Sequence, residues 1–571
     1  MRERKQKRIL EESSSSSESQ DYDSSYSDPD YVAGTSYQRS SRKNFNINPC
    51  INNPNQATEV GSSRRNNGVV ATRRRRTLRR RPGASNKSKR GVFSKKRTIL
   101  SWMIDLGIIF EDMRVWYIRD KEKIIEGTIK RGGVRCNCCH KVITVYGFEE
   151  HANEGHVKEP YAHIYLVDWG CHLLGWIYYK GLLRPEELAR CEFNLVEPRK
   201  DASDLNDDAC MICADGGDLI CCEKCPSTFH PDCMGMKKIP QGEWQCPFCI
   251  CKFCGTGGPS DLHECKQCQR RYHLDCINSP RQPSSPDSPT KFCGKSCEEV
   301  FSEIQEKHLG VRKELADGYT WSLVQMKLDP DPHSNGEFLH EITIGNSKVS
   351  VAWTVMEEIF MPVIDRYTGI NITQSVIYNR ESNLRRVNFR GFYTAILERN
   401  DEFISVASIR VHGTKFAEMP FIGTRERFRG RRMLQKLLAQ IESVRADALS
   451  YYPAGTVSYC SCESNFQALR MLNVENLVIP SVPELVPMWM NKYGFTHIES
   501  NLMTELIKYN TLMFPSAVRL HKSLVTHAAA SAATKTDEAN KNGTGLVRGK
   551  GYEKLAFFDL NLEPLKEDDD A

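Results

Sequence analysis

The sequence of 571 residues contains no run of 18 apolar side chains, which is about the length that an apolar helix needs to cross a bilayer. We therefore expect no transmembrane span and no membrane partner. The first residues, MRERKQKRILEESSSSS, also lack the apolar segment of a secretory signal, so we expect a chain that stays in a reducing compartment. There, closely spaced cysteines bind metal more often than they form disulfides. The 23 cysteines of the chain are therefore candidate metal ligands.

Acidic residues are missing from one basic segment. Residues 64–97 hold 15 of the 78 lysines and arginines and no Asp or Glu, although the chain has a net charge of only +6. The clusters Arg73–Arg76 and Arg79–Arg81 predict a nuclear import signal, with non-specific attraction to nucleic-acid phosphates as a further role and a merely solvated tail as the alternative. Residues 1–96 have too few apolar side chains for a core, so we expect a disordered tail on a protein of the nucleus.

The other end of the chain, residues 511–571, is also low in complexity. A linker rich in Ala, Thr, Asn and Gly, His527–Lys550, precedes the apolar and acidic stretch FFDLNLEPL. Apolar side chains on such a tail indicate a partner groove. The sequence DLNLEP at residues 559–564 resembles the plant repression motif that recruits Topless-type corepressors, which implies such a corepressor as a partner. A chance match and docking back onto this chain are the alternatives.

Residues 207–250 carry the most specific pattern, eight ligands in the order C4HC3. The ligands are Cys210, Cys213, Cys222, Cys225, His230, Cys233, Cys246 and Cys249. A two-residue spacing lets one tight turn aim two side chains at one metal ion, and this order predicts interleaved pairs. We expect the first and third pairs to share one zinc ion, and the second and fourth pairs to share another. A segment this short has little apolar surface, so the metal supplies much of its stability.

The pattern repeats in residues 251–298 with a Ser/Pro-rich insert and a final spacing of three residues. The second set is Cys251, Cys254, Cys265, Cys268, His273, Cys276, Cys293 and Cys297. Only Ile250 separates the two sets, so we expect a tandem unit that holds four zinc ions. The unit uses 14 of the 23 cysteines.

The stretch GGDLICCEKCPSTFH, followed by WQCPFC with Trp244, resembles a PHD finger, whereas a RING-type ubiquitin-ligase module is the weaker alternative. The resemblance implies binding of the histone H3 N-terminal tail as an added strand on the edge Asp218–Cys221, which includes Leu219. No aromatic residue lies between Leu205 and Cys225 to build a cage for a methylated lysine.

Acidic residues precede the first ligand instead. A carboxylate can accept hydrogen bonds from the ammonium group of an unmodified lysine. The segment is similar to the first PHD finger of the autoimmune regulator. This similarity implies that Asp208 faces the fourth-residue lysine of the tail and that Glu223 faces its second-residue arginine. Solvated loop acids are the alternative.

Residues 97–185 begin with RTILSWMIDLGII, which predicts a helix. Cys136, Cys139, His151 and His156 follow at near zinc-finger spacing and predict a fifth metal site, with Cys138 and His163 as competing ligands. A reduced, packed cysteine cluster is the alternative. The segment RCNCCHKVITVYGFEEHA resembles the Tify-domain-binding module of plant nuclear proteins, which implies a docking surface for Tify or other nuclear proteins.

Residues 310–510 are long enough for an α/β core. We expect strands at 403–412, 417–422 and 474–479 and helices at 433–443 and 484–493. A strand, a basic loop (RERFRGRR) and a helix in that order make an anion cradle, although a solvated or nucleic-acid-binding turn is the alternative.

The stretch NFRGFYTAILERNDEFISVASIRVHGTKFAEMPFIGTRERF looks like the acyl-CoA N-acyltransferase (GNAT) domain of plant PHD-finger proteins of the "increased DNA methylation" type. That family is associated with histone acetylation and control of DNA demethylation. The resemblance implies a multidomain α+β protein with tandem cross-braced C4HC3 fingers, a GNAT-type domain and disordered termini.

Acetylation requires a general base that takes a proton from the lysine ammonium. The sequence FAE at residues 416–418 resembles the same strand of the general-control histone acetyltransferases, which implies that Glu418 is this base. We expect burial to raise its pKa, with an ordinary strand acid as the alternative. The residues expected to bind acetyl-CoA are Ile422, Thr424, Arg427, Arg429, Gly430, Arg432 and Met433.

The cofactor loop departs from the family pattern R/Q-x-x-G-x-G/A. Aligned without gaps, its small positions become Arg432 and Leu434, and a two-residue slip recovers only Gly430. The position of the tyrosine acid holds Met490, with Tyr493 off register. The sequence thus predicts a nuclear chromatin regulator that reads histone H3 and acetylates lysine. The alternative is an inactive reader and corepressor scaffold.

Overall fold

The computed structural model describes residues 96–153, 159–197, 205–257, 262–277, 291–327, 336–442, 469 and 472–524. All of these residues fall in one of the two units into which the chain divides. The basic clusters at 73–81, the residue His156 and the motif at 559–564 lie outside the described residues. Within the described part, no helix is both long enough and apolar enough to span a bilayer.

The N-terminal module is a six-stranded antiparallel sheet in the order β4-β3-β2-β1-β5-β6. The strands are β1 (Arg114–Arg119), β2 (Glu122–Lys130), β3 (Gly133–Cys136), β4 (Val142–Ile143), β5 (Ile164–Leu166) and β6 (Cys171–His172). Its helices are α2 (Ile99–Asp105), α3 (Val145–Asn153), α4 (Pro160–His163), α5 (Leu173–Trp176), the π-helix Ile177–Leu182 and α6 (Pro185–Cys191). The predicted first helix is present, capped by Thr98, and it ends before Gly107, whose φ of 70° is left-handed.

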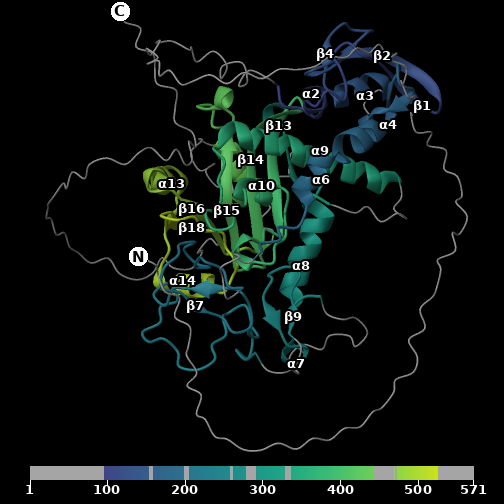
Figure 1. Ribbon diagram of the computed structural model, residues 1–571. Helices are drawn as coiled ribbons and strands as arrows, with labels where there is room; N and C mark the ends of the chain where they lie inside the picture. The colour runs from purple at the N-terminus through teal and green to yellow at the C-terminus, as the bar shows by residue number, and fades with distance from the viewer. Residues whose placement is uncertain are drawn as a thin grey trace, which may run out of the picture. The chain divides into compact units, whose positions relative to one another are not determined.

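Each finger contains a two-stranded antiparallel sheet (Figure 1). The first sheet pairs β7 (Ile220–Cys221) with β8 (Thr228–Phe229), and the second pairs β9 (His263–Glu264) with β10 (Arg271–Tyr272). The second finger continues into α7 (Leu274–Ile277), α8 (Lys295–Glu303) and the π-helix Ile304–His308. The buried cluster of the second finger consists of five cysteines and Tyr272. Such a core is too small to hold a fold by apolar contacts alone.

The C-terminal domain is built on an eight-stranded sheet in the order β11-β12-β13-β14-β15-β16-β18-β17. The strands are β11 (Lys313–Glu314), β12 (Tyr319–Val324), β13 (Phe392–Arg399), β14 (Glu402–His412), β15 (Phe416–Thr424), β16 (Asn476–Ser481), β17 (Thr496–His497) and β18 (Val518–Ser523). The helices are α9 (Gly336–Ile359), α10 (Ile372–Ile377), α11 (Met433–Glu442), α13 (Val486–Tyr493) and α14 (Ser500–Leu506). The strands and helices predicted for this domain are therefore present, with ends shifted by a few residues.

The central strands of this sheet are covered on both faces. Every residue of β15 is buried, and so is every residue of β14 after Glu402. Helix α9 packs against β12 to β15, and α11 packs against β13 to β15. Figure 1 shows β13, β14 and β15 running side by side in green. Strands buried on both faces explain why this part of the sequence is almost continuously apolar.

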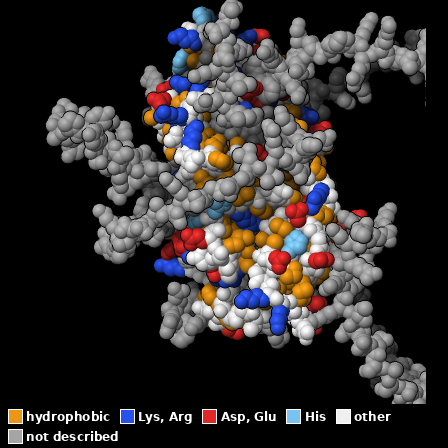
Figure 2. All heavy atoms as spheres, turned by 90° about the vertical axis from the view of Figure 1, so that its left-hand side faces the viewer, with side chains coloured by type: hydrophobic (Ala, Val, Ile, Leu, Met, Phe, Trp, Pro, Cys, Tyr) orange, Lys and Arg blue, Asp and Glu red, His pale blue; other side chains and the backbone are white. Residues whose placement is uncertain are grey.

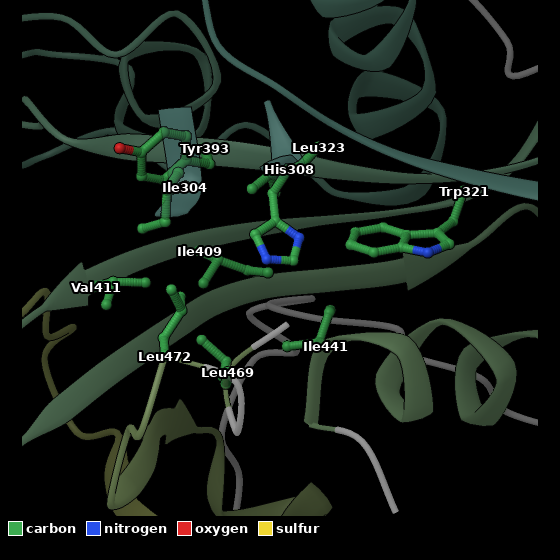
Figure 3. A pocket seen from close by; sticks show the side chains of 10 residues that line it. All are labelled: Ile304, His308, Trp321, Leu323, Tyr393, Ile409, Val411, Ile441, Leu469 and Leu472. Atoms are coloured by element: carbon green, nitrogen blue, oxygen red, sulfur yellow. The ribbon is translucent and has the colours of Figure 1, made fainter. Parts of the chain in front are cut away.

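The core of this domain contains a small apolar cavity of about 20 Å³, shown in Figure 3. It lies among the side chains of Trp321, Ile409 and Ile441, with His308 at its wall. Burial and the nearby Lys313 lower the pKa of His308 to about 4. A space of this size holds about one water molecule, so it is a packing defect of the core and not a cofactor site.

On the face shown in Figure 2, basic and acidic side chains of the described residues are intermingled around patches of apolar side chains. No single sign of charge dominates the visible part of this face. This face therefore has no broad field of one sign that would attract a charged partner.

Candidate functional site

The structure brings the finger ligands together in the interleaved arrangement that the sequence predicts. Four groups have all their ligand atoms within 4.8 Å of one another. In the first finger they are Cys210, Cys213, His230 and Cys233, and Cys222, Cys225, Cys246 and Cys249. In the second finger they are Cys251, Cys254, His273 and Cys276, and Cys265, Cys268, Cys293 and Cys297. Sets of three thiolates with one imidazole, or of four thiolates, are the donors that structural zinc prefers, so the fingers fit zinc.

A recurring turn orients these thiolates. In the first finger the N–H of Ala214 donates to the carbonyl of Cys210 (2.9 Å), and the N–H of Cys210 donates to the carbonyl of Asp215 (2.8 Å). Ala214 has a φ of 61°, and the N–H of Ile212 donates to the Cys210 sulfur (3.4 Å). This turn points both cysteines of the pair at one position and supplies a hydrogen bond to the thiolate.

A lysine supports the second finger from outside the ligand set. Lys252 Nζ donates to the sulfur of Cys293 (2.9 Å). An ammonium beside four clustered thiolates offsets part of their negative charge. The structure thus adds a supporting cation that the ligand spacing did not reveal.

The expected histone edge is strand β7 of the first finger. Strand β7 pairs with β8 on one side, and no other described strand pairs with it. The Leu219 side chain is only 5% exposed and belongs to the core of the finger, so only its backbone is placed to meet a peptide. Glu223 is exposed beyond the end of β7, and Asp208 is half-buried.

The acids before the first ligand have different surroundings. Asp207 is buried, and its two carboxylate oxygens accept hydrogen bonds from Arg386 of the C-terminal domain (2.8 and 2.9 Å). Arg386 also donates to Asp365 (2.6 Å). Burial alone would raise the pKa of Asp365, but the hydrogen bond and charge of Arg386 lower it. Asp207 is therefore part of an ion pair between the first finger and the C-terminal domain.

Two further contacts join the first finger to the C-terminal domain. The N–H of Gly216 donates to Tyr367 Oη (2.5 Å), and a Cβ at Gly216 would lie 2.6 Å from that oxygen. Arg519 Nη2 donates to the carbonyl of Ile212 (2.7 Å). A side chain at position 216 would therefore force Tyr367 to shift away from the finger.

Two neighbouring strands of the C-terminal sheet pair over only part of their length. Strands β15 and β16 run parallel, but they pair only from Phe416–Glu418 to Asn476–Val478. Beyond these pairs β15 continues to Thr424, and a basic loop then leads into α11. Beyond Glu418, the edge of β15 that faces away from β14 therefore has no partner strand in the part of the chain that the structure describes.

The expected cofactor residues lie along this strand and loop, in two groups. Ile422, Thr424 and Met433 are buried, and Thr424 Oγ1 is 2.7 Å from Ser405 Oγ. Gly430 and Arg432 are exposed and left-handed, with φ of 72° and 60°.

Two of the five loop arginines are engaged by acids. Arg425 donates to Glu358 and to Glu402, and Arg427 also pairs with Glu402. Arg429 donates to the Thr424 carbonyl (3.3 Å).

The backbone conformation of the loop fits the pyrophosphate of acetyl-CoA. Arg432 stands where the family pattern has a small residue, yet it adopts the left-handed conformation that a glycine takes most easily. A Cβ at Gly430 would have nothing within 4 Å, so the loop is open there. Arg431 and Arg432 are exposed at the N-terminal end of α11, where phosphate is favoured.

The expectation of a raised pKa for Glu418 is wrong. The side chain is fully buried, and Oε1 accepts hydrogen bonds from Arg410 Nε (2.7 Å) and His412 Nε2 (2.9 Å), while Oε2 accepts the N–H of Leu512 (2.7 Å). Burial alone would raise the pKa of Glu418, but the Arg410 charge and the His412 hydrogen bond lower it to about 2. A carboxylate with such a low pKa is a weak base. The surroundings of Glu418 therefore suit an ion pair inside the sheet.

In the N-terminal module, the structure groups Cys136, Cys138, Cys139 and His151. The competing ligand His163 lies elsewhere, with Nδ1 3.2 Å from the carbonyl oxygen of Ile118. The twenty described cysteines are all free thiols.

The cross-braced first finger defines the chain as a PHD-finger protein, and the divided parallel pair places its C-terminal domain in the GNAT-type fold. Three family models match: "Increased DNA methylation 1, C-terminal domain" at residues 360–449 and 462–523, "Tify domain binding domain" at 127–179, and "PHD-finger" at 210–249. The PHD match favours a PHD finger over a RING module.

The chain is a homologue of Increased DNA methylation 1 from Arabidopsis thaliana, with 32% identity over 442 residues. The match covers 75% of this chain and 34% of that protein, so the chain spans about a third of its relative's length. The human Autoimmune regulator is 47% identical over 47 residues, which are 8% of this chain and 9% of that protein. The ribosomal-protein-S18-alanine N-acetyltransferase of Escherichia coli aligns with a TM-score of 0.20 and 9% identity, over 33% of this chain and 94% of that chain.

Proposed function

We propose that the protein is a nuclear chromatin regulator whose first finger binds the unmodified N-terminal tail of histone H3. The observation that carries the proposal is the edge of β7, which pairs with no other described strand and has Glu223 exposed beyond its end. A peptide added as a strand gains backbone hydrogen bonds there, and the acids on either side give it a register. The homology to Increased DNA methylation 1 and the similarity to Autoimmune regulator support a role in chromatin.

The preference for an unmodified lysine follows from the chemistry of Asp208. A carboxylate accepts hydrogen bonds from a primary ammonium, and trimethylation removes all of these donors. The finger has no aromatic residue before Cys225 that would replace them by cation–π contacts.

A peptide titration with the full chain tests this proposal. We expect an unmodified H3 tail peptide to bind at least about ten-fold more tightly than the peptide trimethylated at its fourth residue, a difference of about 1.4 kcal/mol. Asp208→Asn should remove the preference, whereas Asp232→Asn, at an exposed acid of the same finger, should leave it unchanged. Equal affinities for the two peptides with the unchanged chain would contradict the proposal.

Lysine acetylation is the second candidate function, and the divided pair β15 and β16 favours it. The backbone of the loop at Gly430 and Arg432 and the N-terminal end of α11 would hold the pyrophosphate of acetyl-CoA, and β15 beyond Glu418 would line the bound cofactor. When bound, acetyl-CoA supplies the acyl thioester. The tight ion pair of Glu418 favours the alternative, a scaffold that does not acetylate.

Calorimetry with acetyl-CoA separates the two candidates. Binding that weakens on Arg432→Glu and persists in Arg114→Glu, at an exposed arginine of the N-terminal module, would support acetylation. No binding to a folded chain would favour the scaffold.

Further partners follow from other segments of the chain. We propose that residues 127–179 dock Tify-type proteins, in line with their family match. The proposals of nuclear import and nucleic-acid contact through residues 73–81, and of a corepressor bound at residues 559–564, concern segments outside the described residues.

A further inference from the structure

The turn that begins at Cys136 in the N-terminal module has the same backbone geometry as the zinc-binding turns of the fingers. The N–H of His140 donates to the carbonyl of Cys136 (2.9 Å), and the N–H of Cys136 donates to the carbonyl of Lys141 (3.0 Å). Three finger turns repeat both bonds at the same spacing. They begin at Cys210 (2.9 and 2.8 Å), Cys251 (2.9 and 2.9 Å) and Cys265 (2.9 and 3.1 Å).

The residue after the second cysteine is left-handed in all four turns. It is His140 with a φ of 56°, Ala214 with 61°, Gly255 with 75° and Gln269 with 57°. In the fingers this conformation ends the turn so that both sulfurs of a Cys-x2-Cys pair face one metal position. The pair Cys136 and Cys139 therefore has the backbone of a metal-binding turn, although it lies in a different module with a different sheet.

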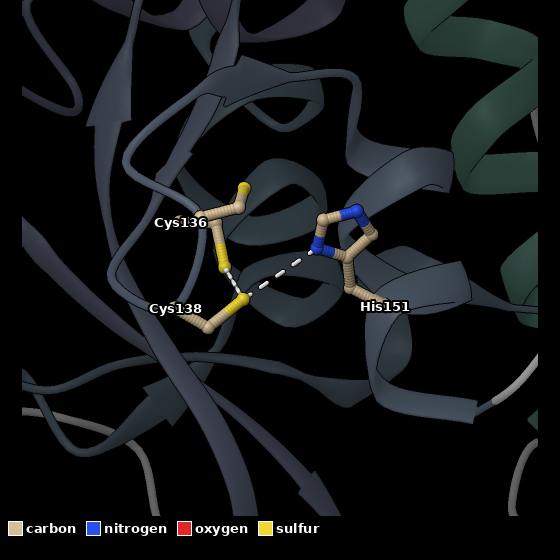
Figure 4. A group of neighbouring side chains, drawn as sticks. Cys136, Cys138 and His151 are labelled. Atoms are coloured by element: carbon tan, nitrogen blue, oxygen red, sulfur yellow. Dashed lines mark hydrogen bonds between the residues drawn. The ribbon is translucent and has the colours of Figure 1, made fainter.

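The side chains around this turn complete a set of four ligands. Cys136 is fully buried at the end of β3, and Cys138 is exposed. The sulfur of Cys138 lies 2.9 Å from the Cys136 sulfur and 3.6 Å from His151 Nδ1 (Figure 4). With Cys139, all four ligand atoms lie within 4.8 Å of one another. Three thiolates and one imidazole are also the donors at the first site of each finger.

We propose that Cys136, Cys138, Cys139 and His151 bind a fifth zinc ion that the N-terminal module holds independently of the fingers. This ligand set differs from the spacing-based expectation because Cys138 replaces His156, which lies outside the described residues. Soft thiolate donors select zinc over magnesium or calcium. The exposed side chains of Cys138 and His151 leave the ion a route from solvent.

The ion has a structural task in this module. It joins the turn between β3 and β4 to helix α3, which carries His151. The N-terminal end of α3 is held in turn by the C-terminal domain, since the Val145 N–H donates to Asp401 Oδ2 (3.2 Å). All four ligands lie inside the Tify-domain-binding match at 127–179, so the ion stabilises the fold of that docking module.

Metal analysis of the full chain tests the proposal. We expect five zinc ions per chain after purification under reducing conditions, and four in Cys138→Ser. Cys191→Ser is the matched control because Cys191 is half-buried and lies outside every described cluster, so it should retain five ions. Four ions in the unchanged chain, or five in Cys138→Ser, would overturn the proposed site.

Cobalt replacement provides a second readout that does not depend on the stability of one variant. The cobalt spectrum of the full chain minus that of His151→Ala should show the sulfur-to-metal and tetrahedral bands of one Cys3His site. A difference spectrum without these bands would overturn the assignment. A Cys136–Cys138 disulfide would do so too, if it is found by peptide mapping of the purified chain after alkylation without further reduction.

Discussion

Arg386 holds Asp207 with two nearly parallel hydrogen bonds, from Nε to Oδ2 (2.8 Å) and from Nη2 to Oδ1 (2.9 Å), although the residues lie 179 positions apart. The side chains are 6% and 4% exposed, and Arg386 also binds Asp365. A two-bond arrangement fixes orientation as well as distance. The residue three positions before the first zinc ligand is thus fixed to the C-terminal domain.

Arg386→Met should destabilise the described unit strongly, because it leaves Asp207 and Asp365 buried without their cation. The expected loss is about 3–5 kcal/mol in the free energy of unfolding, measured by chemical denaturation at pH 7. Arg366→Met is the control, since Arg366 pairs with Asp215 where the side chains are 57% and 39% exposed, and it should cost less than about 1 kcal/mol. Similar losses in the two variants would show that the buried pair does not join the domains.

Glu418→Gln should destabilise the chain by an amount that does not change between pH 5.5 and 8. With a pKa lowered to about 2, Glu418 is ionised in both the folded and the unfolded chain over this range, and its stabilising effect is lost only as pH falls from about 4.5 through 2. The measurement is the difference in unfolding free energy between the two proteins. A difference that shrinks steadily as pH rises toward 7 would indicate a raised pKa and restore Glu418 as a candidate base.

The pKa of Asp401 is shifted in the opposite direction from that of Glu418. Burial raises its pKa from 3.8 to about 6, so the folded chain binds a proton there more tightly than the unfolded chain does. Because burial disfavours the charged form of Asp401, the free energy of unfolding should fall as pH rises from about 4 through 6. Relative to Asp401→Asn, we expect the unchanged chain to lose about 1.4 kcal/mol between pH 5 and 7.5. Parallel stability curves for the two proteins would contradict this assignment.

Chelation should unfold the fingers, because cysteines are four of the nine buried residues in the core of the first finger and five of the six in that of the second. Trp244 reports the change, since its ring packs edge-on against Phe229 with centroids 5.5 Å apart. We expect a strong chelator to shift the tryptophan emission toward that of exposed indole, and added zinc to reverse the shift. In Trp244→Phe most of this shift should be lost. Unchanged emission in the chelated chain would show that the first finger holds its fold without metal.

The parts of this protein that could be predicted from sequence are those with local causes. The zinc pairs depend on a turn of six residues, and the strands and helices around Glu418 depend on a continuous apolar pattern. The partner of Asp207 could not be predicted, because Arg386 is far away in sequence and lies in a short 3-10 turn without any motif. The pKa of Glu418 was missed for a similar reason, since burial alone predicts a rise and only the folded sheet places Arg410 and His412 beside it. In the N-terminal module, spacing identified the pair Cys136 and Cys139, but the third cysteine depends on how the turn bends.

Ile250 is the whole connection between the two fingers, because Cys249 belongs to the last ligand group of one and Cys251 to the first group of the next. Only two consecutive peptide units therefore separate the two ligand residues, and the backbone has no spare length to let one finger rotate while the other stays still. An insertion next to Ile250 would lengthen this link, so the two metal sites would no longer be held at a fixed distance and orientation. A partner bound to one finger would then no longer have a fixed orientation relative to the other finger.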